Sequence, residues 1–211
     1  MQGRALSVKV LASIEKIPCA WGLFLGIKCC GFRVICFELA FLIELPLIMT
    51  DKSVPQVFTS PTYGQVSWEE ALSKMAWFMG VDTSASYELI IGTDSEAQNG
   101  TADYVAALIV HKKGRGGIYF WSRQRLENIF SMKQRIWQEA LISLGIAEKL
   151  VSDFASMGLV DLNLEIHVDV GPNGPTREMI NEIVGMIRAN GFKVATKPAS
   201  WGASHVADRH V

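Results

Sequence analysis

Cysteine is absent from most of this chain of 211 residues. All four cysteines lie within residues 1–48, at positions 19, 29, 30 and 36. Their spacing, with one adjacent pair, matches neither a common zinc pattern nor a disulfide framework. The cysteine-free remainder, from Met49 onward, is typical of a protein of the reducing cytoplasm, so a cytoplasmic location is expected.

The first 48 residues also lack a hydrophobic run long enough to span a membrane. Their longest uncharged stretch, Ile17–Ile27, has 11 residues, whereas a spanning helix needs about 20. Charged residues follow it at positions 28, 33, 38 and 44, and no small-residue cleavage site stands out. Contact with a membrane is therefore expected only if this segment is a native part of the protein.

Composition changes sharply at Met49, where Met-Thr-Asp-Lys-Ser resembles an ordinary protein start. We interpret residues 1–48 as an apolar N-terminal extension that results from a mis-called start codon. A membrane-associated or signal-like segment and a genuine packed extension remain the alternatives. The rest divides into a lead-in with a capping helix, residues 49–86, and one domain of ordinary size, residues 87–211.

An excess of positive charge is missing as well. The net charge is −1 and the sequence pI is about 6.4. A nucleic-acid partner would therefore have to be held by a local patch or through metal. The segment Gly171–Pro175 opens a predicted helix, and its amides can bind an anion. It lacks the length and the Lys-Ser/Thr pair of a Walker loop, which excludes a P-loop NTPase.

The order of the predicted elements indicates an α/β fold. Residues 50–66 read as an irregular lead-in, and Ser67-Trp-Glu-Glu70 forms a capping box that starts a helix. After it, strands are predicted at residues 87–93, 103–111, 118–122, 162–170 and 192–196, and helices at residues 131–157, 175–189 and from 200 to the end. The order βββαβαβα predicts a mixed five-stranded sheet with helices on its faces.

Four acidic residues fall on four different elements of this plan. Asp94 ends the first strand, Glu139 lies in the long helix, Asp169 ends a later strand and Asp208 lies in the terminal helix. Carboxylates from separate elements can converge on a pair of magnesium ions, which prefer oxygen ligands. Two such ions can activate a water for in-line displacement at phosphorus.

Each of these acids also has a simpler interpretation. Asp94 and Asp169 can be turn residues, Glu139 can be solvated on the polar side of its helix, and Asp208 can pair with Arg209 or cap the helix. His205 lies one turn before Asp208 and is a candidate proton carrier. A packed, hydrogen-bonded role is favoured for the remaining candidate of this kind, the histidine at position 167.

Two basic runs are candidates for contact with a nucleic-acid backbone. Lys112, Lys113 and Arg115 form the first, for which a solvated hairpin tip is the favoured interpretation. The second run, near the start of the long helix, has Arg or Lys at positions 123, 125, 133 and 135. Lys197, at the end of the last strand, can approach the same mouth as the four acids.

Several short phrases resemble the ribonuclease H-like superfamily over about residues 87–211. They are Ile91-Gly-Thr-Asp-Ser95, Arg135-Ile-Trp-Gln-Glu-Ala140, Ile166-His-Val-Asp-Val-Gly171 and Lys197-Pro-Ala-Ser200, and they are similar to the YkuK-like group of small bacterial proteins. The superfamily carries metal-binding acids on its first strand, first helix, fourth strand and last helix. The resemblance therefore implies that the acids named above hold Mg²⁺ or Mn²⁺.

The function implied by this resemblance is two-metal hydrolysis of phosphodiester bonds in nucleic acid, without an organic cofactor. The alternative is a non-catalytic ribonuclease H-like module that binds nucleic acid or protein, because a fold does not by itself confer an activity. A phosphotransferase related to the actin-like kinases is disfavoured, since no second, duplicated domain is present.

Overall fold

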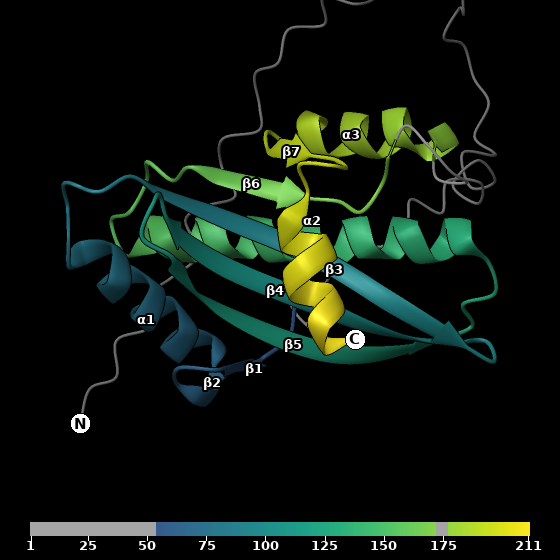
Figure 1. Ribbon diagram of the computed structural model, residues 1–211, viewed down its shortest axis with the longest axis horizontal. Coiled ribbons are helices and arrows are strands. Elements are labelled where there is room, and N and C mark those ends of the chain that lie inside the picture. The colour runs from purple at the N-terminus through teal and green to yellow at the C-terminus, as the bar shows by residue number, and fades with distance from the viewer. Residues whose placement is uncertain (1–53, 172–176) are drawn as a thin grey trace, which may run out of the picture. The chain divides into compact units, whose positions relative to one another are not determined.

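The computed structural model describes residues 54–171 and 177–211, so residues 1–48 and most of the Gly171–Pro175 segment lie outside it. A mixed sheet forms the centre of the described domain (Figure 1). The strands are β1 (Val57–Ser60), β2 (Gly64–Ser67), β3 (Tyr87–Gln98), β4 (Thr101–Lys112), β5 (Gly117–Glu127), β6 (Leu164–His167) and β7 (Lys193–Ala195). The helices are α1 (Trp68–Gly80), α2 (Met132–Ser156), η2 (Arg177–Met179), α3 (Ile180–Ala189), η3 (Gly202–Ala207) and η4 (Asp208–His210).

The sheet has the strand order β2-β1-β5-β4-β3-β6-β7. β3 and β4 are antiparallel over their whole length, from the pair Tyr87–Lys112 to the pair Gln98–Thr101. On its other side β3 is parallel to β6, and β6 is parallel to β7. The predicted element order βββαβαβα from residue 87 is therefore confirmed, with three antiparallel strands followed by two crossovers.

The sheet has seven strands instead of the predicted five. The lead-in, which we expected to be irregular, forms the β1–β2 hairpin, and Phe58 of this hairpin is buried. β3 and β5 also extend beyond their predicted ends. The turn Asn99–Gly100 has positive φ at both residues, which suits a tight hairpin, so pairing continues through polar residues that carry no hydrophobic signal.

The helices follow local signals closely. Ser67 and Glu70 form the predicted capping box at the start of α1. In α2 the buried face passes through Ala147, Leu150 and Phe154, whereas Val151 is 38% exposed.

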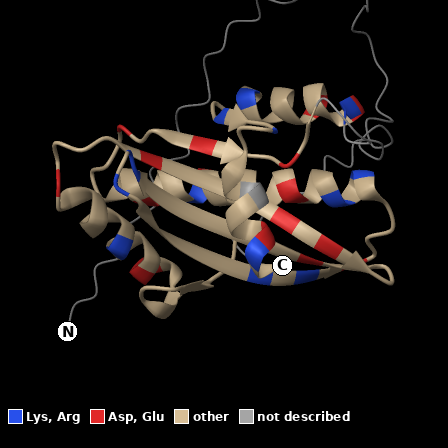
Figure 2. Cartoon of the chain, viewed as in Figure 1, with Lys and Arg blue, Asp and Glu red and all other residues tan. Residues whose placement is uncertain are grey.

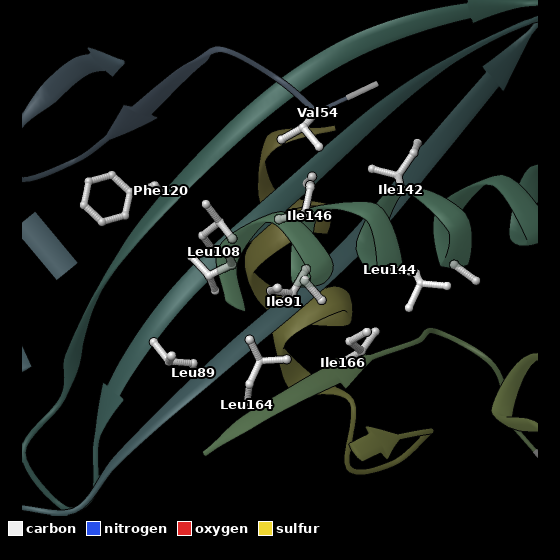
Figure 3. Close-up of a cluster of buried hydrophobic side chains, with 14 of the residues drawn as sticks. Val54, Leu89, Ile91, Leu108, Phe120, Ile142, Leu144, Ile146, Leu164 and Ile166 are labelled. Carbon is white, nitrogen blue, oxygen red and sulfur yellow. The ribbon is translucent and has the colours of Figure 1, made fainter. Parts of the chain in front are cut away.

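The two faces of the sheet are covered by different helices. Leu89 and Ile91 of β3 point to the same side as Ile142 and Ile146 of α2, in the larger of two hydrophobic clusters (Figure 3). Ile90 points to the opposite face, where the C-terminal segment crosses the sheet (Figure 1). Neither the helices of residues 54–171 nor those of 177–211 include one long and apolar enough to cross a membrane.

The predicted terminal helix is present as a π-helical turn, η3, followed by the 3₁₀ turn η4; together we call them the C-terminal helix. The C-terminal helix begins at Gly202, which packs directly against the sheet. The backbone N–H of Gly202 donates to Nδ1 of His167 at 3.0 Å. A Cβ at this position would lie 2.6 Å from Cγ2 of Ile90 and 2.9 Å from Nδ1 of His167. A residue without a side chain is therefore required at this contact.

We predict that Gly202→Ala lowers the free energy of unfolding by about 1–3 kcal/mol, because the added methyl group overpacks this contact. Gly185→Ala is the matched control, since a Cβ at Gly185 in α3 meets nothing within 4 Å; it should raise stability by about 0.5–1 kcal/mol. Urea unfolding measures both. Equal stability of Gly202→Ala and the parent protein would contradict the close contact.

Candidate active site

The site lies where β6 ends beside β3. Their parallel pairing runs from Leu89–Leu164 to Gly92–His167, and Asp94 of β3 and Asp169 each lie two residues beyond the last pair. Because side chains alternate between the faces of a strand, both acids lie on the face that the C-terminal helix covers. Figure 2 shows the acidic positions of β3 beside that helix.

The carboxyl group of Asp94 lies in surroundings that disfavour its charged form. Burial raises its pKa to about 6, while a hydrogen bond from the Ser95 backbone N–H acts in the opposite direction. Charge repulsion from Asp169 and from Asp208 raises the pKa further, and so does a hydrogen bond with the Asp208 side chain. Three of the four predicted acids therefore lie near one another, from β3, from the residues after β6 and from η4.

Glu139 reaches this group from the opposite side of the sheet. Its side chain on α2 is 6% exposed, which shows that the interpretation of a solvated helix residue was wrong. Oε1 of Glu139 accepts a hydrogen bond of 2.5 Å from Oγ of Ser95. Burial raises the pKa of Glu139 to about 8 against the Ser95 hydrogen bond and the Arg135 charge, and repulsion from Asp94 and Asp169 adds to the increase.

Asp169 has one oxygen in an ion pair and one without a partner. Nζ of Lys197 lies 2.9 Å from Oδ2, so this lysine approaches the acids as expected from its position. Oδ1 is buried and has no hydrogen-bond partner in the described part of the chain. A buried carboxylate oxygen without a donor is costly, and a bound cation would relieve that cost.

The C-terminal helix carries the remaining candidates at its surface. Asp208 and His205 are both exposed, so both are accessible from solvent at the edge of the acidic group. His167 is different: it is 2% exposed, its Nδ1 accepts from Gly202, and burial lowers its pKa. The interpretation of His167 as a packed, hydrogen-bonded residue is confirmed.

Most of the candidate basic residues are engaged with protein groups. Lys112 contacts Asp82 at 2.7 Å, Arg125 contacts Asp103 through two hydrogen bonds of 2.6 Å, and Arg123 donates to the backbone carbonyl of residue 210. Lys133 lies 4.0 Å from Glu182. In Arg135, by contrast, Nε is buried and has no hydrogen-bond partner within the described residues.

Divalent metal fits this group by its donor chemistry. Carboxylate oxygens are the ligands that magnesium and manganese prefer, four of them converge from four elements, and one of their oxygens is buried without a donor. As they stand, no three His, Cys, Asp or Glu side chains of residues 54–171 and 177–211 are close enough to hold an ion. Repulsion among unneutralised carboxylates, and the Lys197 contact of Asp169, favour such separation.

Sequence reasoning missed Ser95 and Tyr104 as neighbours of the site. Ser95 binds Glu139, and Tyr104, its cross-strand partner on β4, is fully buried with a hydroxyl that has no partner among the described residues. Burial and the Glu139 charge raise the pKa of Tyr104 to about 12. The alternation of β3 would have identified Ser95, because the residue next to Asp94 must face α2.

We predict that, without metal, the free energy of unfolding falls as pH rises from about 5 to about 8. The pKa of Glu139 rises from its ordinary value of 4.5 to about 8 in the folded protein, so over this range the folded state binds more protons than the unfolded chain. Glu139→Gln should flatten the dependence and stabilise the protein near pH 8 by on the order of a few kcal/mol.

Urea unfolding in the presence of a chelator, at several pH values, measures this effect. Glu148→Gln, an exposed position on the same helix, is the matched control and should leave the slope unchanged. The comparison of variant with parent removes the opposite contribution of His167, whose lowered pKa makes stability rise with pH. The same slope in Glu139→Gln as in the parent would contradict the assignment.

Comparison with known proteins agrees with the fold. A family model described as ribonuclease H-like matches residues 70–211. The chain is 27% identical over 164 residues to the uncharacterized protein YkuK of Bacillus subtilis (strain 168), across 72% of this chain and 95% of that relative. No solved structure matches the chain. The chain therefore belongs to the ribonuclease H-like family, as a YkuK-like member.

Proposed function

We propose that this protein is a metal-dependent nuclease that hydrolyses phosphodiester bonds in nucleic acid. The observation that carries the proposal is the convergence of four carboxyl groups from β3, α2, the end of β6 and η4 at one edge of the sheet. Charge repulsion from Asp94, Asp169 and Asp208 raises the pKa of a neighbouring carboxyl group, and this repulsion lowers the stability of the folded protein. Retaining repulsive carboxylates side by side is expected where a cation or substrate compensates them.

In this proposal Asp94 and Asp169 hold the metal ions, and Glu139 and Asp208 complete the ligand set. Mg²⁺ or Mn²⁺, when bound, would supply a Lewis acid for the phosphate oxygens and lower the pKa of the attacking water. Ser95 positions the Glu139 carboxylate through its short hydrogen bond. His205, exposed one turn before Asp208, carries a proton to or from the reacting phosphate.

The second candidate function is a binding module that keeps the family fold without cleavage. The family fold is consistent with nucleic-acid binding, and the contact of Lys197 with Asp169 already neutralises one acid. The two candidates differ in a direct way: only the nuclease needs the negative charge of Asp94. Binding without cleavage in any substrate class, with or without metal, would favour the module.

We predict that Asp94→Asn abolishes cleavage while the fold persists, because the amide keeps the size of the carboxyl group and loses the charge that attracts cations. The assay follows labelled single-stranded RNA, single-stranded DNA, duplex and hybrid substrates with Mg²⁺, with Mn²⁺ and with chelator. Activity in the parent protein should require the metal. Glu148→Gln serves as the control for loss of an acidic residue elsewhere on the surface.

Thermal unfolding with and without magnesium gives a readout that is independent of the substrate. A ligand that binds only the folded state at about 100 times its dissociation constant stabilises it by about 2.7 kcal/mol. The parent protein should show such a shift and Asp94→Asn a smaller one. A fully active Asp94→Asn protein, or a parent protein with neither a metal-dependent shift nor cleavage, would overturn the nuclease.

A further inference from the structure

We propose that a cavity at the start of α2 binds one unpaired base of a single-stranded nucleic acid, with an adjacent phosphate on Arg135. The cavity has a volume of about 380 Å³ and lies between the β3–β4 turn and the first turn of α2. Its lining includes Gln98, Asn99, Phe130, Ser131 and Arg135. This inference rests on the nucleic-acid part of the proposed function and is independent of cleavage.

Phe130 is the central observation. Its side chain is 79% exposed, which is unusual for a phenylalanine, yet its backbone is held firmly. The Phe130 N–H donates to Oε1 of Gln134 at 3.1 Å, and the same side chain donates from Nε2 to the carbonyl of Asn128 at 2.9 Å. The N–H of the preceding residue, Ile129, donates to the Gly100 carbonyl at 3.0 Å. The ring is therefore presented to solvent by a fixed segment.

The turn beneath the ring supports the same arrangement. A Cβ on Gly100 would lie 2.9 Å from Cε1 of Phe130, so the ring rests against the glycine backbone of the β3–β4 turn. Gly100 has a φ of +81°, a backbone conformation that residues other than glycine rarely adopt. An exposed aromatic ring on a rigid support is the surface on which a base stacks, as in proteins that bind single strands.

Charge favours nucleic acid over a protein partner at this cavity. The lining contains the cation Arg135 and the amides of Gln98 and Asn99, and it contains no acidic residue. Nε of Arg135 is buried and has no hydrogen-bond partner within the described residues, so Arg135 brings to this cavity a cation whose Nε is not paired with a group of the protein. The amides offer both donors and acceptors to the edge of a base.

Two other cavities of the described residues do not combine these features. The cavity beside Trp77 is lined by Glu69 and Glu70, which repel phosphate. In the cavity beside Trp121, that ring is stacked on the His210 ring at 4.5 Å, and the guanidinium of Arg123 donates to the His210 carbonyl. Those groups are already used within the protein.

The cavity is also placed to hold a strand that passes through the acidic site. Arg135 lies one helical turn before Glu139, about 6 Å along α2, and its charge lowers the pKa of that carboxyl group. Gln98 lies about 13 Å along β3 from Asp94. Stacked bases are about 3.4 Å apart, so the bound base would be a few nucleotides from the carboxylates. Figure 2 shows basic residues at the start of α2 and acidic ones on β3.

Fluorescence anisotropy with labelled ten-nucleotide oligothymidine and oligouridine, in chelator, tests the inference. Every protein carries Asp94→Asn so that cleavage cannot interfere. Phe130→Ala should weaken binding by about 5- to 150-fold, the range for loss of one stacking contact. Phe130→Trp should restore affinity. Phe130→Leu, which keeps an apolar side chain without a π face, should bind as weakly as the alanine variant.

Arg135→Gln should lower the slope of log affinity against log salt concentration by about 0.7, the value for one phosphate contact in a single strand. Trp77→Ala is the matched control, because Trp77 is an aromatic residue of 63% exposure in the acidic cavity. This variant should bind single strands as tightly as the protein that carries Asp94→Asn alone. A duplex of the same length should be insensitive to Phe130→Ala. Thermal unfolding confirms that each variant is folded.

The outcomes separate this inference from the proposed nuclease. Unchanged affinity in Phe130→Ala, equal affinity of the leucine and tryptophan variants, or no binding of any single strand would overturn the cavity assignment. Weakened binding in Phe130→Ala, together with a wild-type protein that shows neither cleavage nor a metal-dependent thermal shift, would support the cavity and overturn the nuclease. If cleavage requires Asp94, but Phe130→Ala leaves the affinity unchanged and Arg135→Gln leaves the salt slope unchanged, the nuclease would be supported and the cavity assignment overturned.

Discussion

The acidic group exists because β3 continues beyond the end of β6. The parallel pairing stops at Gly92 and His167, whereas β3 remains paired with β4 up to Gln98. Beyond that point β3 has a strand neighbour on one side only, and the open side receives Asp169. Binding sites of α/β proteins commonly lie in such a crevice at the carboxyl ends of strands, next to a change in strand order. Here α2 and the C-terminal helix contact β3 from the two faces of the sheet.

This arrangement places charge where the domain is least able to solvate it. Glu139 is buried among apolar residues of α2, and Asp94 lies under the C-terminal helix, so burial and mutual repulsion raise both pKa values. Ser95 and Lys197 compensate only part of this cost, one by a hydrogen bond and the other by an ion pair. The stability of the domain is therefore coupled to protonation of these groups and to any cation that they bind.

The neutral composition of the chain conceals how its charges are arranged. Arg125, Lys112 and Lys133 are matched with acids of the same surface, which leaves little general attraction for a polyanion. Contact with nucleic acid must then depend on a few residues at defined positions. Arg135 is such a residue, since it lies between the cavity that contains Phe130 and the carboxylate of Glu139.

Local patterns were sufficient for the order of the elements and for assigning each of the four acids to its element. The capping box at Ser67, the apolar run before Asp94 and the helical period around Glu139 are patterns of residues close in sequence, so they can be read from the sequence alone. The β1–β2 hairpin was missed because its strands are short and polar and are stabilised mainly by pairing with each other and with β5.

Other features were decided only when distant segments met. The burial of Glu139 depends on α2 packing against β3, and the requirement for glycine at position 202 depends on Ile90 and His167, far away in the sequence. The pairing of Arg125 with Asp103, which removes it from a predicted phosphate-binding run, depends on the register of β4 and β5. Composition and spacing record which side chains are available, but burial and charge partners are properties of the packed chain, because both depend on which surfaces exclude water.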